Sequence, residues 1–243
     1  MKFLFRAIFV FCLAAGLPVH AQWGAIGGLL GGGGGGGDVD AVLTSGTKII
    51  VFTTIATDLA VSSALQMLEA FPPEQVEAIK NTFVKYNELK AKRGAEGQLD
   101  SDSATLASDG FKEMEKLKVA DYQKGKSQVV RSAYTKMGLA MAADALAATQ
   151  LPTFVKSGSS AISSLASNPL QITKLGRLKV VVGTVTVLAK AVPSQINSIK
   201  TVRELAKKIA EAEGVQLGEA KLSLTSIDPE ALNQQIKSKE EEG

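Results

Sequence analysis

Two aspartates stand in stretches that are otherwise apolar or made of small residues. Asp58 is the single charge in residues 49–68, and Asp144 lies within residues 137–148, a segment rich in Ala. A buried carboxylate is costly unless it is paired or protonated, so each could be a polar contact inside a ligand cavity. Because charged side chains are seldom fully buried, we favour the alternative that both face solvent or a neighbouring Lys or Arg.

The residues that most often perform catalysis are nearly absent. Cys12 and His20 are the only Cys and His, and both lie in an N-terminal segment that we expect to be removed. The remaining chain then lacks the groups for a Ser-His-Asp triad, a Cys nucleophile or the commonest zinc and haem ligands. Residues 45–48 fit the Ser-x-x-Lys pattern of penicillin-recognising enzymes, but the companion Ser-Asp-Asn and Lys-Thr-Gly elements do not occur. The sequence predicts a non-enzymatic protein that uses no cofactor and no metal.

The N-terminus has the pattern of a secretory signal peptide. Lys2 and Arg6 precede an apolar run over residues 7–17, and Pro18 and Ala21 supply the break and a small residue for cleavage. The run is shorter than the roughly 20 residues that span a bilayer. We therefore predict a signal peptide over residues 1–21. The absence of Cys and of Asn-x-Ser/Thr acceptors beyond it favours a bacterial exported protein, most simply in the periplasm, with an extracellular location as the alternative.

Residues 22–37 form a Gly-rich segment that ends in seven consecutive glycines. Glycine loses the most backbone entropy on ordering, so we expect a flexible tether. The alternative is that the segment anchors to a membrane surface or partner through apolar side chains, with Trp23 as the main contact.

The rest of the chain, residues 38–243, predicts one all-α, bundle-like domain of about six or seven helices with a charged C-terminal tail. The apolar segment 49–68 is the expected central helix, and the small residues of 137–148 are expected to pack against it. Residues 180–187 are rich in β-branched side chains and could form a strand, but we favour a helix because no partner strand is evident. Expected helices cover residues 39–70, 74–93, 109–124, 127–150, 169–192, 195–213 and a short one from 228. A polar loop is expected at 95–108 and either a helix or a loop at 153–167, with a helix end at Pro152 and a break or kink at Pro193.

The formal net charge is only +3, and Lys2 and Arg6 contribute two of these charges. This balance does not predict nucleic-acid binding, which requires a basic patch. We expect a scaffold, adaptor or accessory binding module with an unidentified protein partner in the cell envelope. Two alternatives stay open: a carrier of an apolar ligand such as lipid, lined by residues 49–68, 137–151 and 178–192, and a membrane-active helical protein.

Overall fold

The computed structural model describes residues 37–92, 99–166, 172–218, 234 and 238. Within these residues the secondary structure is entirely helical, which confirms the all-α prediction. Five α-helices and one short 3-10 helix are present there: α3 (Gly37–Leu68), α4 (Pro73–Lys92), α5 (Ser101–Met114), η2 (Val119–Asp121), α6 (Ser127–Ala166) and α7 (Ile172–Ala212). The predicted count of six or seven is not confirmed, and the expected tether and the helix from residue 228 lie outside the described residues, except for residues 234 and 238, which are helical.

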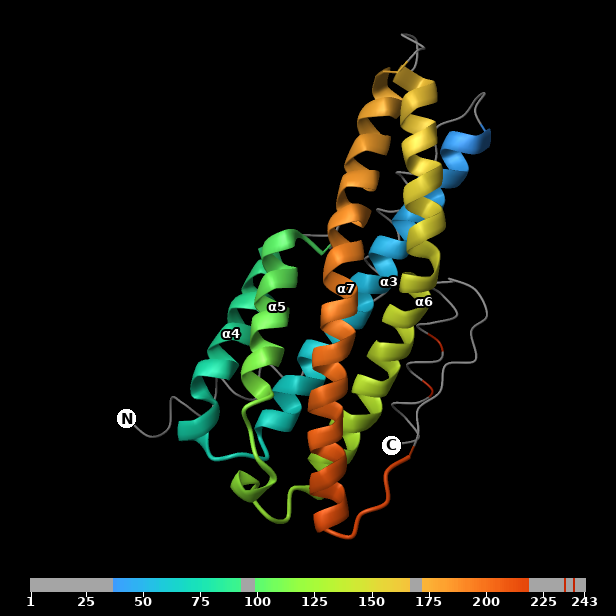
Figure 1. Cartoon of the computed structure of the whole chain (residues 1–243). Coiled ribbons are helices and arrows are strands. Elements are labelled where there is room, and N and C mark those ends of the chain that lie inside the picture. The colour runs from blue at the N-terminus through green and yellow to red at the C-terminus, as the bar shows by residue number, and fades with distance from the viewer. Residues whose placement is uncertain (1–36, 93–98, 167–171, 219–233, 235–237, 239–243) are drawn as a thin grey trace.

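Three long helices, α3, α6 and α7, form the main bundle, and α4 and α5 form a hairpin at its side (Figure 1). α3 packs most extensively against α6, as predicted, and Ala140, Ala143 and Ala147 of α6 are fully buried. The ends of α6 and α7 that are joined by residues 167–171 extend well beyond the α4–α5 hairpin (Figure 1). We call residues 154–166 of α6 and 172–187 of α7, which include this extension and reach the start of α5, the stalk.

The predicted central helix is the core helix of the bundle. Ile49, Phe52, Ala56, Ala60 and Met67 of α3 are each at most 1% exposed. Among the described residues, the segment Val39–Leu68 is the one helix long and apolar enough to cross a membrane, yet 67% of its most apolar window is buried inside the protein. An apolar helix has to be enclosed by neighbours or by lipid, and here the neighbours are α6 and α7.

Glycines allow close packing in the stalk. A Cβ on Gly46 of α3 would lie 2.4 Å from Val181 and 2.5 Å from the Phe154 ring, and a Cβ on Gly158 of α6 would lie 2.6 Å from Val182. The three helices therefore approach one another too closely here for a larger side chain. Val182 and Val185 are buried in this packing, and the β-branched segment 180–187 is helical, as we favoured over a strand.

The structure corrects the predicted ends at the two prolines. α6 runs through Pro152 and α7 runs through Pro193, and the segment 153–166, left open by the sequence, is helical. Proline within a helix costs about 3 kcal/mol. Burial of the neighbouring side chains, Leu151 and Phe154 in α6 and Val192 in α7, outweighs that cost.

The predicted loop at residues 95–108 is wrong for its second half, because α5 begins at Ser101 rather than near Asp109. The Asp100 side chain accepts a hydrogen bond from the Ser103 amide at 2.7 Å and caps the helix. The predicted end near residue 124 is also wrong, because α5 ends at Met114 and the short helix η2 and irregular chain lie between it and α6. The start of α6 and the end of α7 were predicted to within one residue. Gly125 interrupts the chain before α6 with φ of +86°, and Gly214 follows α7 with φ of +67°, conformations that favour glycine.

Candidate functional site

A buried polar cluster connects the three long helices near the middle of the bundle. Asp144 of α6 and Thr57 of α3 are fully buried, and Gln195 of α7 is 2% exposed. The Gln195 Nε2 group donates to Asp144 Oδ2 and to Thr57 Oγ1, each at 2.9 Å. The Thr57 hydroxyl in turn donates to the Thr53 carbonyl oxygen at 2.8 Å. One carboxamide therefore joins α7 to both of the other long helices.

The environment of Asp144 favours its neutral form. Desolvation by burial raises the pKa of this carboxyl well above its usual range, and the hydrogen bond from Gln195 opposes that shift more weakly. Asp144 Oδ1 has no hydrogen-bond partner in the described part of the chain. Our favoured interpretation, that Asp144 faces solvent or a cation, is therefore wrong. The small residues around it create a site that is closed to solvent, and the carboxyl is buried beside a carboxamide.

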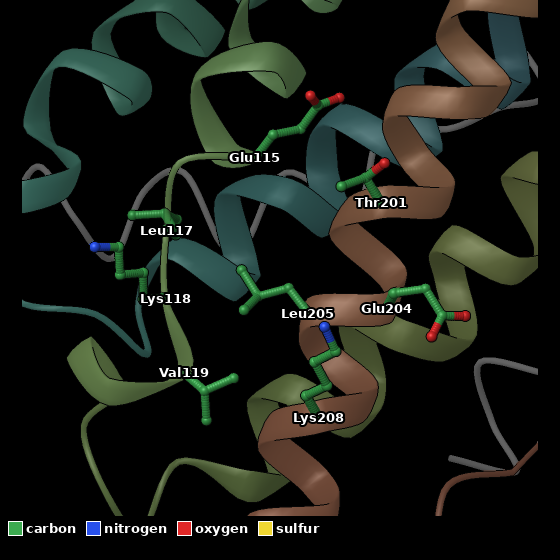
Figure 2. A pocket seen from close by; sticks show the side chains of 8 residues that line it. All are labelled: Glu115, Leu117, Lys118, Val119, Thr201, Glu204, Leu205 and Lys208. Carbon is green, nitrogen blue, oxygen red and sulfur yellow. The ribbon is translucent and has the colours of Figure 1, made fainter.

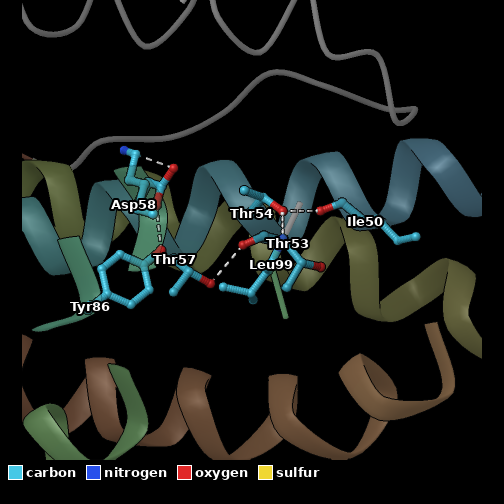
Figure 3. Close-up of polar contacts among 8 residues, drawn as sticks. Ile50, Thr53, Thr54, Thr57, Asp58, Tyr86 and Leu99 are labelled. Carbon is cyan, nitrogen blue, oxygen red and sulfur yellow. Dashed lines mark hydrogen bonds and ion pairs between the residues drawn. The ribbon is translucent and has the colours of Figure 1, made fainter. Parts of the chain in front are cut away.

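Asp58, in contrast, does meet a cation, as we favoured. Its Oδ2 lies 3.0 Å from the Lys90 Nζ of α4, with 16% of the Asp58 side chain exposed, and its Oδ1 accepts a hydrogen bond from the Tyr86 hydroxyl. One helical turn earlier, the Thr54 hydroxyl donates to the Ile50 carbonyl and accepts from the Leu99 amide at 3.0 Å (Figure 3). Thr54 and Asp58, one helical turn apart on α3, thus connect α4 and the residue before the α5 cap to the core helix.

A groove between α5 and α7 lies next to the buried cluster, on the α5 side of Gln195. Its volume is about 210 Å³, and Gln195 lines it. A hollow of about 340 Å³ shares Ser101 and Val187 with it, so the two are adjacent, and we call them together the α5–α7 groove. Many of the lining side chains are short, namely Ser101, Ala104, Thr105 and Ser108 from α5 and Thr184, Val187, Ala191 and Ser194 from α7. The lining also includes the charged side chains of Asp100, Asp109 and Lys112. Short hydroxyl and methyl groups at helical spacing are suited to contact with another polypeptide segment.

A second groove, of about 350 Å³, lies between α7 and the chain that leads from α5 through η2 (Figure 2). Its lining includes three apolar side chains, those of Leu117, Val119 and Leu205. Two carboxylates and two ammonium groups surround it, those of Glu115, Glu204, Lys118 and Lys208. These opposite charges balance, so the groove gives no preference for an anionic or a cationic ligand.

The structure does not bring the sequence-predicted site residues together. Asp58 contacts α4, Asp144 contacts α7, and Trp23 lies outside the described residues. No group of three or more His, Cys, Asp or Glu side chains able to hold a metal occurs among the residues that the structure describes. Sequence reasoning missed Gln195, because a single Gln in an amphipathic helix carries no signal of its partner 51 residues away.

Comparisons with known proteins give no relative from which a function could be transferred. No protein-family model matches the chain, and no curated protein and no solved structure shows significant similarity to it. Function therefore has to be inferred from the chain's own residues.

Proposed function

We propose that the chain is an exported, non-enzymatic helical protein that serves as a scaffold, adaptor or accessory binding module of the bacterial cell envelope. The export signal at residues 1–21 supports the location, and the Gly-rich residues 22–37 would tether the helical domain to its attachment point. A short C-terminal helix starting at Asp228 and Pro229 would add a sixth helix to the domain.

The observation that carries this proposal is an uncovered face of α7 on the stalk. Val180 is 67% exposed and Val187 is 45% exposed, and they are two of the three large hydrophobic residues that are exposed in the described part of the chain. Val187 lines the groove beside the start of α5, whereas the end of α7 before it, with Val180, extends past α5 (Figure 1). Exposed apolar surface that the fold does not need is typical of a protein interaction site.

The size of the native complex tests this role. The mature protein is extracted from the host envelope under mild conditions and sized by gel filtration with detection by antibody. We expect wild-type protein to elute in a complex, and the double variant Val180→Asp, Val187→Asp to elute as the free chain. Val84→Asp is the matched control, since Val84 is the third exposed valine, 46% exposed, and lies on α4. Elution of wild-type and double variant at the same monomeric size would contradict an adaptor role.

A further inference from the structure

The uncovered α7 face has the spacing of a coiled-coil seam. Four exposed residues of α7 follow one another at intervals of four, three and four positions: Gly176, Val180, Gly183 and Val187. We call these four residues the α7 face. This is the heptad spacing with which one helix packs its side chains between those of another. Ala191 and Ser194 continue the same line into the groove between α5 and α7.

The two glycines leave room for a close partner. A Cβ built on Gly176 or on Gly183 would meet nothing within 4 Å, in contrast to the crowded Gly46 and Gly158 on the inner side of the stalk. These glycines therefore do not serve packing inside the described part of the chain. Glycine inside an exposed helix destabilises it by about 1 kcal/mol relative to alanine. A partner backbone that approaches the seam closely would offset this cost.

The charged side chains that α7 places beside the α7 face are basic, whereas the adjoining α5–α7 groove carries both signs, with Asp100, Asp109 and Lys112 in its lining. Between Asp144 and Glu204 the sequence contains no acidic residue and seven basic ones. Lys179 and Lys190 are exposed and flank the α7 face on the same side. Acidic residues do occur on α3, where Asp40 lies 3.2 Å from the Lys174 Nζ, so one stalk cation is already paired. A second copy of α7 would bring like charges together, whereas an acidic helix would complement them.

Building on the adaptor role proposed above, we propose that the α7 face binds one amphipathic α-helix of a partner protein, with small or apolar residues at its seam and Glu or Asp beside them. The partner helix would lie along the α7 face, from the exposed end of α7 as far as the start of α5. Its apolar residues would pack between Val180 and Val187, and its carboxylates would meet Lys179 and Lys190.

A helical partner fits the α7 face better than an anionic membrane does. Interfacial membrane helices bury Trp, Phe or Leu side chains, and α7 contains no aromatic residue. The glycines of the seam would add no apolar area to a membrane contact, whereas they do allow two helices to approach. The same lysines could nevertheless attract any polyanion, so the test includes competing surfaces.

The test is a binding titration with the full chain and synthetic peptides. One fluorescent peptide of about three heptads carries Leu and Ala at its seam positions and Glu at the flanking positions, and a second carries Lys in place of Glu. By fluorescence anisotropy we expect the Glu peptide to bind and the Lys peptide to bind at least about tenfold more weakly. The double variant Lys179→Glu, Lys190→Glu should reverse this preference.

Gly183→Leu separates binding from folding. Its side chain would extend into open space, so the unfolding midpoint should stay the same or rise, while affinity for the Glu peptide should fall about tenfold. Equal binding of both peptides, no binding of either, or an unchanged affinity in Gly183→Leu would overturn the proposal. Binding to phosphatidylglycerol vesicles or to duplex DNA without binding to the Glu peptide would overturn it as well. In each case a native complex that depends on Val180 and Val187 would still support an adaptor with a different class of partner.

Discussion

Replacement of Asp144 by asparagine should make the protein more stable at neutral and alkaline pH. In the unfolded chain an aspartate titrates near pKa 3.9. Burial raises the pKa of Asp144 in the folded protein well above that value. The stability contributed by the protonated carboxyl is therefore fully present below about pH 3.9 and is lost as pH rises through the raised pKa of the folded state. Between these two values, the folding equilibrium constant falls by up to about tenfold per pH unit.

The asparagine side chain of the Asp144→Asn variant would imitate the protonated aspartic acid. Its carbonyl oxygen can accept the hydrogen bond from Gln195 Nε2, and its amide group would occupy the position of Oδ1, which has no partner among the described residues. At about pH 4 the variant and the wild type should differ by no more than about 1 kcal/mol, the net worth of one hydrogen bond. Between that pH and the raised pKa of Asp144 the variant should gain on the wild type by up to about tenfold in the folding constant per pH unit, and the difference should then stay constant at higher pH.

Urea unfolding followed by far-UV circular dichroism at a series of pH values measures this difference. The control is Asp58→Asn, which should have the opposite effect. Asp58 is partly exposed and bonded to Lys90 and Tyr86, so its neutralisation should cost about 1–3 kcal/mol at neutral pH. Parallel pH profiles for wild type and Asp144→Asn would show that Asp144 titrates alike in both states and would refute its desolvated environment.

Four further outcomes are expected. Gly46→Ala should lower the free energy of unfolding by about 1–3 kcal/mol, because the added Cβ overlaps Val181 and Phe154. Gly183→Ala should raise it by up to about 1 kcal/mol, because the added Cβ faces open space. Chemical denaturation of both variants measures the two changes. Tyr86→Phe should cost about 1–3 kcal/mol through the lost hydrogen bond to Asp58, again by denaturation, and a cost near zero would contradict that contact. The intact mass of the exported protein should correspond to a chain that begins at Gln22, and retention of residues 1–21 would refute the predicted cleavage. The emission of Trp23, the only Trp, should stay unchanged on mixing with vesicles if residues 22–37 are a tether, whereas a blue shift would favour the surface-anchor alternative.

The sequence predicts the helical class and the core helix because periodicity and the apolar run at residues 49–68 are local signals. It fails at Pro152 and Pro193 because tertiary packing of Leu151, Phe154 and Val192 outweighs local helix propensity. The helix start at Ser101 could have been found, since Asp100 is a favourable cap before the helical spacing of Ala104, Ala107 and Phe111.

The candidate site was harder to predict for two reasons. The burial of Asp144 depends on Thr57 and Gln195, which lie on other helices far away in the chain, so no local pattern reveals it. The charge asymmetry is the opposite case, because the acid-free stretch between Asp144 and Glu204 is visible in the sequence. The balanced total charge conceals it, and only the fold shows that its exposed cations Lys179 and Lys190 flank an uncovered helix face.

Site-specific photo-cross-linking tests most directly whether the α7 face meets a partner helix. A benzophenone amino acid replaces Val180, Val187 or, as the control, Val84, and host cells that export the full chain are irradiated. We predict one adduct of the same size at positions 180 and 187, with the cross-linked partner peptide lying in an acidic amphipathic helix, and no such adduct at position 84. Absence of an adduct at both α7 positions, or the same adduct at position 84, would contradict the assignment of the α7 face as the binding surface.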